Sequence, residues 1–131
     1  MSGGMLSFAI LVAAAAAQAA PSAIPTSGSV LLRSLEAGDG AAVRAMLAPD
    51  ATVAKDREGE VSVDTVIAHL RGCTRGELFW DYDEEDRSRA TVTAVYACPA
   101  RIELHAWTSR AGIAWIQIFT ASPASAGDSV R

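Results

Sequence analysis

Apolar residues recur along the chain with two different spacings. Up to Gly72 they recur every three or four positions, as at Val43, Met46 and Leu47, which is the spacing of one face of an α-helix. From Gly76 onward they alternate with polar residues, and this alternation is typical of a half-buried β-strand. The pattern therefore predicts helices first and a run of hairpin-linked strands afterwards.

Three helices are predicted, and polar caps or glycines delimit them. A Ser or Asp side chain at a helix start accepts hydrogen bonds from free backbone N–H groups, and a glycine at a helix end adopts positive φ without penalty. In chain order these are a helix capped by Ser27 or Ser29 and ended by Gly38, a helix over 39–47 capped by Asp39, and a helix capped by Ser62 or Asp64 and ended by Gly72.

The strands are predicted from short runs rich in β-branched and aromatic residues that lie between turn signals. They cover 51–53, 60–62, 77–82, 89–98, 101–108 and 112–120. Pro49 and Asp50 separate the second helix from the first strand, because proline cannot continue a helix. The predicted fold class is α+β, with three N-terminal helices packed on one face of an antiparallel sheet.

The segment 35–53 carries a resemblance to a known superfamily. It reads Leu-Glu-Ala-Gly-Asp, then a hydrophobic helix, then Leu-Ala-Pro-Asp-Ala-Thr-Val. This resembles the opening of the nuclear transport factor two-like superfamily, which includes ketosteroid isomerase, scytalone dehydratase and polyketide-cyclase-like proteins. The resemblance covers 29–120 and implies a curved sheet wrapped into a cone around a pocket. It also implies a homodimer, because members of the superfamily often pair through their sheets.

Composition and charge narrow the class of protein. The chain has 131 residues, enough for one domain, and 50% of them are hydrophobic. A net charge of -4 and scattered Arg and Lys residues offer no basic surface for nucleic acid or for an anionic membrane. We therefore expect neither nucleic acid nor, after signal cleavage, a membrane as partner.

The N-terminal residues have the pattern of an export signal. An Ala-rich apolar run from Met5 to Ala20 ends in small residues before Pro21, which predicts cleavage after Ala19 or Ala20 and a periplasmic or secreted protein. No Lys or Arg precedes the run. A membrane anchor is the alternative, but the run is short and weakly hydrophobic for a span of about 20 residues. The predicted organisation is a signal peptide over 1–20, a linker over 21–28, a domain over 29–120 and a disordered tail over 121–131.

Cys73 and Cys98 are the only cysteines of the chain. Exported proteins keep paired cysteines oxidised, so a disulfide is predicted, with two buried thiols as the alternative. The two cysteines and two histidines do not have the spacing of a zinc site. The acidic run 83–86 lacks the ligand spacing of an EF-hand and is expected to be a solvated turn. No metal or cofactor is therefore predicted.

The last two predicted strands form a hairpin around the turn at 110–111, and its register assigns side chains to faces. If Leu104 lies opposite Gln117, one face is apolar except for that amide, whereas a shift by one residue would reverse the faces. We expect this face to meet the helices and to line a pocket for a small apolar ligand with one polar group. The predicted pocket residues are Leu104, Trp115, Gln117, Phe119 and Tyr96. The alternative is that they only fill the core.

Comparison with ketosteroid isomerase, as the resemblance invites, argues against its chemistry. Where that enzyme has its general-base Asp, this chain has Lys55, with Asp56 one position later. Where it has the oxyanion-hole Tyr, this chain has Leu31, so the donor that stabilises an enolate is missing. His69 is expected to be exposed near a helix end, and His105 to lie on the mixed face of the sheet. Asp56 and His69 are kept as candidate acid/base residues.

Three functions are consistent with these observations. The favoured interpretation is an exported, non-catalytic domain that binds a small molecule or serves as an accessory protein. The first alternative is a small lyase or isomerase of the polyketide-cyclase type, which uses an Asp or His as acid/base group. The second alternative is a non-catalytic structural dimer. The fold alone does not choose among them, because one fold can host many functions.

Overall fold

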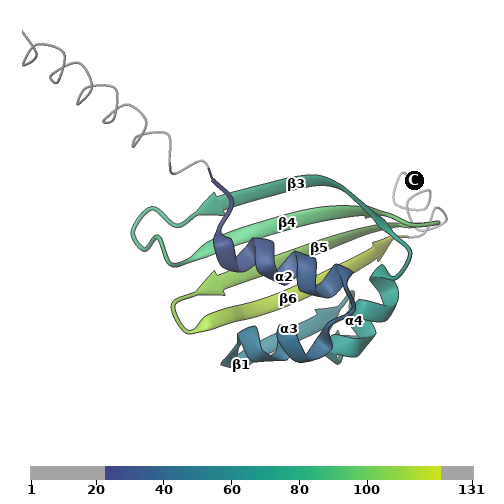
Figure 1. Cartoon of the computed structure of the whole chain (residues 1–131), viewed down its shortest axis with the longest axis horizontal. Coiled ribbons are helices and arrows are strands. Elements are labelled where there is room, and N and C mark those ends of the chain that lie inside the picture. Colours follow the sequence, from purple (N-terminus) through teal and green to yellow (C-terminus); the bar gives the residue numbers. More distant parts are fainter. Residues whose placement is uncertain (1–22, 122–131) are drawn as a thin grey trace, which may run out of the picture.

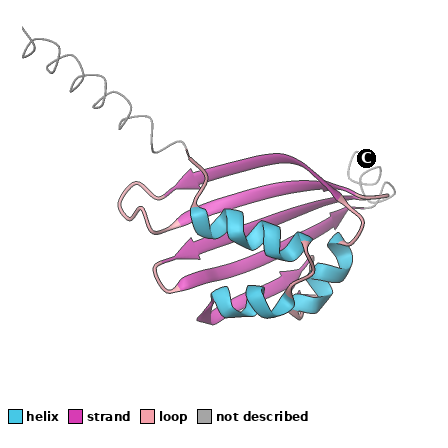
Figure 2. Ribbon diagram, in the orientation of Figure 1, coloured by secondary structure: helices cyan, strands magenta, loops and turns pink. Residues whose placement is uncertain are grey.

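The computed structural model of the chain describes residues 23–121. In this part of the chain three helices lie on one face of a six-stranded sheet, as Figures 1 and 2 show. The α+β class is therefore confirmed. The predicted signal peptide and almost all of the predicted tail lie outside the described residues. Within the described part, no helix is both long enough and apolar enough to cross a membrane.

The elements follow one another as α2 (Thr26–Glu36), α3 (Gly40–Met46), β1 (Leu47–Lys55), β2 (Gly59–Glu60), α4 (Val63–Leu70), β3 (Thr74–Tyr82), β4 (Ala90–Ala97), β5 (Arg101–Ser109) and β6 (Gly112–Ala121). The capping predictions hold at Asp39 and Ser62, whose side chains accept from the N–H groups of Ala42 and Thr65. Helix α2 differs, because it begins after Pro25 without a side-chain cap, inside the predicted linker.

The sheet is mixed rather than antiparallel, which corrects the prediction. Its strand order is β2-β1-β6-β5-β4-β3, and it is open at both edges. β3 to β6 form successive antiparallel hairpins, whereas β1 pairs with β6 in parallel. Two strands also precede α4, so the helices do not all come before the sheet. β1 is longer than predicted and runs through Pro49, which lies where its pairing with β6 is irregular and the missing N–H is tolerated.

The predicted register of the last hairpin is wrong beyond its first pairs. The hairpin starts as predicted, with Thr108 opposite Ile113, but the next pair is Trp107 opposite Trp115, so Ala114 is an extra residue on β6. Such a bulge reverses the alternation of every residue that follows it. Ile116 and Ile118 therefore face the helices and are buried. The β6 residues that alternate with these two isoleucines face the opposite side of the sheet, away from the helices.

The core lies between the helices and this inner face of the sheet. Leu31, Leu32 and Leu35 of α2 pack there, together with side chains from every strand from β4 to β6. Helix α2 approaches the sheet closely, because a Cβ at Gly28 would lie 2.7 Å from a methyl group of Val92. A side chain at position 28 would push the helix away from β4.

A polar network ties α2 to the sheet at the edge of the core. The buried Tyr96 hydroxyl donates to Glu36 at 2.6 Å, and Arg75 pairs with the same carboxylate at 2.7 Å. Burial first, and then the bond to the carboxylate, raise the pKa of Tyr96 far above its usual value, so the phenol stays protonated. The network joins the end of α2 to β3 and β4.

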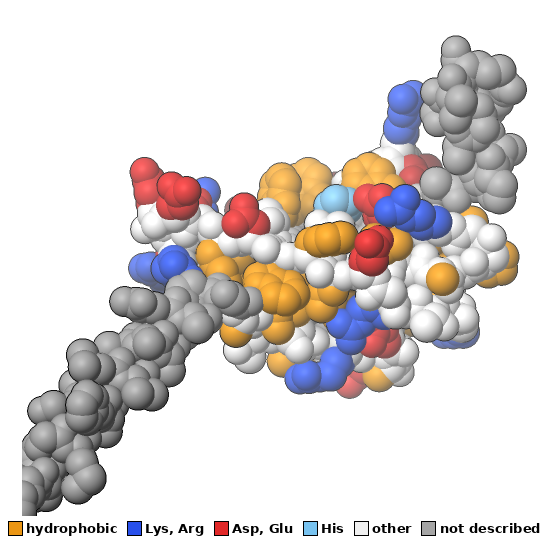
Figure 3. Space-filling model, turned by 90° about the horizontal axis from the view of Figure 1, so that it is seen from above, with side chains coloured by type: hydrophobic (Ala, Val, Ile, Leu, Met, Phe, Trp, Pro, Cys, Tyr) orange, Lys and Arg blue, Asp and Glu red, His pale blue; other side chains and the backbone are white. Residues whose placement is uncertain are grey.

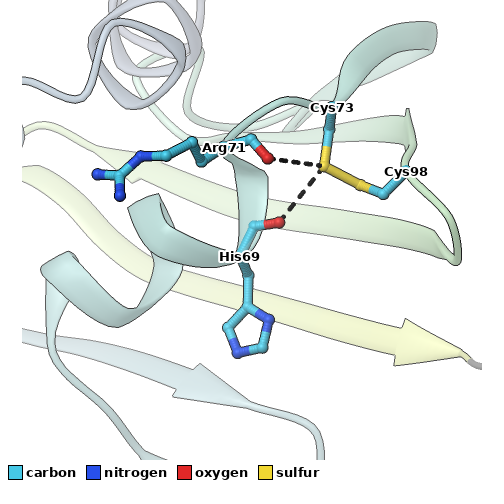
Figure 4. Close-up of a disulfide and its surroundings, with 4 residues drawn as sticks. All are labelled: His69, Arg71, Cys73 and Cys98. Atoms are coloured by element: carbon cyan, nitrogen blue, oxygen red, sulfur yellow. Dashed lines mark hydrogen bonds between the residues drawn. A yellow bond between two sulfur atoms is a disulfide. The ribbon is translucent and has the colours of Figure 1, made fainter.

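Cys73 and Cys98 form the predicted disulfide, which joins the residues after α4 to the end of β4. In Figure 4 the side chains of His69 and Arg71 point away from it. The Cys73 sulfur lies 3.3 Å from the backbone oxygen of His69, so the bridge also fixes the last turn of α4. The bridge closes the β3–β4 hairpin into a loop.

Candidate functional site

The face of the sheet opposite the helices, which we call the open face, carries a regular arrangement of side chains. Cross-strand partners form three rows, because paired residues of neighbouring strands point to the same side. The first row is Asp81, Thr91, Trp107 and Trp115, the second is Phe79, Thr93, His105 and Gln117, and the third is Val95, Glu103 and Phe119.

Large aromatic side chains of the open face are exposed to solvent. Phe79, Trp107 and Phe119 are 55%, 47% and 45% exposed. The Trp107 ring packs against the Trp115 ring at a centroid distance of 5.3 Å, and Phe119 meets His105 edge-on at 5.3 Å. Figure 3 shows orange side chains gathered along the upper margin on both sides of a histidine. An apolar patch of this kind on a small domain marks a binding surface.

A chain of hydrogen bonds crosses the middle of the open face. His105 bonds to the Thr93 hydroxyl through Nδ1 and to Glu103 through Nε2, both at 3.2 Å, and Arg101 pairs with Glu103 at 2.9 Å. The order acid, imidazole, hydroxyl is that of a hydrolytic triad. However, Thr93 lies in β4 between two paired strands, so the backbone N–H groups around it donate to neighbouring strands and offer no oxyanion hole. The arrangement holds the imidazole in place but does not build a nucleophilic site.

A cavity of about 350 Å³ opens at the end of the open face where the β3–β4 and β5–β6 turns meet. It is lined by Asp81, Tyr82, Asp83, Arg89, Ala90, Thr91, Trp107, Thr108, Ser109 and Ala114. This volume lies within the range of about 300–1,000 Å³ that ligand pockets have. Because Trp107 lines the cavity and also belongs to the aromatic patch, the two form one continuous surface.

Asp56 lies in the turn after β1, at φ 46°, and its carboxylate is fully engaged. It accepts hydrogen bonds from the backbone N–H and the hydroxyl of Thr120 and pairs with Lys55 at 3.3 Å. Partial burial acts to raise its pKa, but the bonds from Thr120 and the Lys55 ammonium outweigh burial and lower it. A carboxylate stabilised in this way is a poor general base.

The other predicted site residues are not brought together. His69 is exposed on α4, with its ring directed away from the disulfide (Figure 4). The five predicted pocket residues do not share one face of the sheet, because the bulge at Ala114 turns the later β6 residues to the other face. Leu104 and Tyr96 are in the core, whereas Trp115, Gln117 and Phe119 lie on the open face. Gln117 accepts from the Trp115 indole and donates to the Asp56 carbonyl.

Sequence reasoning missed the cavity and the hydrogen-bonded histidine. The strand pairing puts His105 on the face opposite the helices, and Trp107 lies on the same face two positions along β5. Asp81, in the strand predicted over 77–82, lies on β3 across from Thr91. The available signal is the pairing itself, because Asp81, Thr91 and Trp107 form one row once the register is known.

Within the described residues, no three His, Cys, Asp or Glu side chains are grouped to hold a metal ion.

The chain is a small α+β domain, and solved structures share its fold. A protein from Sphaerobacter thermophilus superposes with a TM-score of 0.53 at 15% identity, over 73% of this chain and 94% of that chain. The Orange Carotenoid Protein of Anabaena (Nostoc) sp. PCC 7120, solved binding canthaxanthin, superposes with a TM-score of 0.53 at 13% identity, over 79% of this chain and 38% of that chain. At these identities the likeness concerns the fold alone. Comparison with protein-family models and with curated proteins found no match to the chain.

Proposed function

We propose that this protein is an exported, non-catalytic binding domain of the nuclear transport factor two-like superfamily, and that it holds a small apolar ligand on the open face. The observation that carries the proposal is the exposed aromatic surface of Phe79, Trp107 and Phe119, which continues into the cavity. Covering such a surface removes apolar area from water, and each buried Å² contributes about 25 cal/mol.

Several findings support the parts of this proposal. The disulfide suits an oxidising compartment, which agrees with the export signal expected from the sequence. The structural likeness to the Orange Carotenoid Protein, solved binding canthaxanthin, is consistent with an apolar ligand. The engaged carboxylate of Asp56 and the exposed His69 favour binding over lyase or isomerase chemistry. These positions are where acid/base groups were expected.

The test is native mass spectrometry of the protein purified from a periplasmic fraction without refolding. We expect a bound small molecule in the wild type and in Trp80→Ala, and its loss in Trp107→Ala. Trp80 is the matched control, because it is also a partly exposed Trp but lies outside the open face. A monomer that is empty in every preparation, and that takes up no apolar probe on titration with the uncharged dye Nile red, would overturn the proposal.

A structural homodimer is the second candidate, because the same aromatic surface could be covered by a second copy of the chain. The mass spectrum separates the two functions. A dimer without ligand that Trp107→Ala converts into a monomer would favour the structural role and overturn ligand binding.

A further inference from the structure

The cavity at the turn end of the open face differs from the rest of that face because acidic groups form one wall. Asp81 and Asp83 line it together with one cation, Arg89, which pairs with Asp83 at 3.8 Å. Asp83 is further fixed by accepting from the N–H groups of Glu85 and Asp86. Figure 3 shows acidic side chains, with Lys or Arg side chains near them, at this end of the molecule. The wall therefore has more negative than positive charge.

Asp81 is the carboxylate left for a ligand. Among residues 23–121 its side chain has no hydrogen bond and no ion pair, and the same is true of the Thr91 hydroxyl next to it. Asp81 is exposed to solvent at the cavity, and a carboxylate that the chain does not pair attracts cations from solution. The negative charge of Asp81 is therefore available to pair with a bound cation.

The opposite wall of the cavity is an indole face. Asp81, Thr91 and Trp107 are cross-strand neighbours in one row, so the carboxylate and the indole are two strand spacings apart, roughly 10 Å. Thr91 is small and leaves the space between them open. Trp107 is held in place by Trp115, so its ring is a prepared surface for stacking. The recess therefore has a carboxylate at one end, a hydroxyl on its floor and an aromatic wall at the other end.

We propose that this cavity binds a small organic cation, an amine whose ammonium group pairs with Asp81 and whose flat apolar body stacks on Trp107. The proposal rests on the proposed function and names the chemical class of its ligand. The cavity volume of about 350 Å³ corresponds to roughly twelve water molecules at about 30 Å³ each, which leaves room for a ligand of about ten non-hydrogen atoms. The Thr91 hydroxyl accepts a second hydrogen bond from the ammonium.

The experiment is isothermal titration of the full-length protein with three probes of similar size and different charge. These are phenethylamine, phenethyl alcohol and phenylacetate, which are a cation, a neutral molecule and an anion at pH 7. We expect the amine to bind about five- to tenfold more tightly than the alcohol, and its affinity to fall as salt is raised, because salt screens a partly exposed pair. Phenylacetate is expected to bind more weakly than the alcohol.

Variants separate this inference from the proposed function. Asp81→Asn should remove the preference for the amine over the alcohol, whereas the matched control Glu84→Gln, in the neighbouring turn but outside the lining, should keep it. Trp107→Ala should weaken both probes. Equal binding of amine and alcohol that Asp81→Asn leaves unchanged would overturn the cation site while ligand binding on the open face stands. Tighter binding of phenylacetate would also overturn it, since Arg89 would then be the recognising group.

Discussion

Two neighbouring residues of β6 should differ sharply in their effect on stability. Ile118 is fully buried beneath the helices, whereas Phe119 is 45% exposed on the open face. Truncating a fully buried Ile to Ala removes its packing and leaves a cavity, at a cost of about 3–4 kcal/mol. Complete burial of a Phe contributes about 1.5–3 kcal/mol, so Phe119→Ala, with about half of that burial to lose, should cost about 1 kcal/mol.

The measurement is urea unfolding of the wild type, Ile118→Ala and Phe119→Ala, followed by far-ultraviolet circular dichroism with the disulfide intact. Phe79→Ala is the matched control, because Phe79 is an exposed Phe of the same face. We expect Phe119→Ala and Phe79→Ala to behave alike, and Ile118→Ala to lose at least twice as much free energy of unfolding. The opposite ranking, with Phe119→Ala the more damaging, would mean that β6 keeps the register set at its turn and that the bulge at Ala114 is absent.

Three further changes probe the supports of the fold. Tyr96→Phe removes a hydrogen bond to the Glu36 carboxylate, which is one-third exposed. The variant should lose about 1–2 kcal/mol of free energy of unfolding and about 5–10 °C of Tm in calorimetry. An unchanged Tm would mean that water replaces the phenol hydroxyl without loss of stability. Replacing Cys73 and Cys98 together by Ser opens a loop with a sequence separation of 25 and should cost about 3–4 kcal/mol in the same assay, whereas a smaller loss would indicate a compact unfolded state. Because the folded-state pKa of Asp56 is lowered, its contribution to stability is present at neutral pH and is lost as the pH falls below about 4. The free energy of unfolding of Asp56→Asn should therefore decline less steeply with acid than that of the wild type. Parallel pH profiles of the two proteins would contradict the hydrogen bonds assigned to Asp56.

Much of the local structure could be predicted because local chemistry determines it. The caps at Asp39 and Ser62 and the positive φ of Gly72 follow from residues within one helical turn, and the sequence alone identifies them. The four hairpin strands follow from alternation and turn residues. Helix α2 begins earlier than the serine caps predict, because Pro25 precedes its first turn.

The open face could not be predicted because it depends on one extra residue. The turn at 110–111 sets the first pairs of the hairpin as expected, but Ala114 then shifts all later pairs by one. Nothing in the local sequence requires a bulge there. It is favoured by the packing of Ile116 and Ile118 against the helices, which is a tertiary effect. The cavity between Asp81 and Trp107 depends on three strands at once and therefore appears only when their pairing is known.

The position of β6 has a consequence for the order in which the chain can fold. β6 is the last strand of the described chain, yet it lies between β1 and β5, and its residue Trp115 pairs with Thr52. β1 can therefore join the sheet only after nearly the whole domain has been synthesised, and closing so long a loop slows folding. During synthesis the β3–β5 hairpins can form early while β1 and the helices beside it have no finished surface to cover. A chain with this topology therefore remains incompletely folded until its final strand emerges.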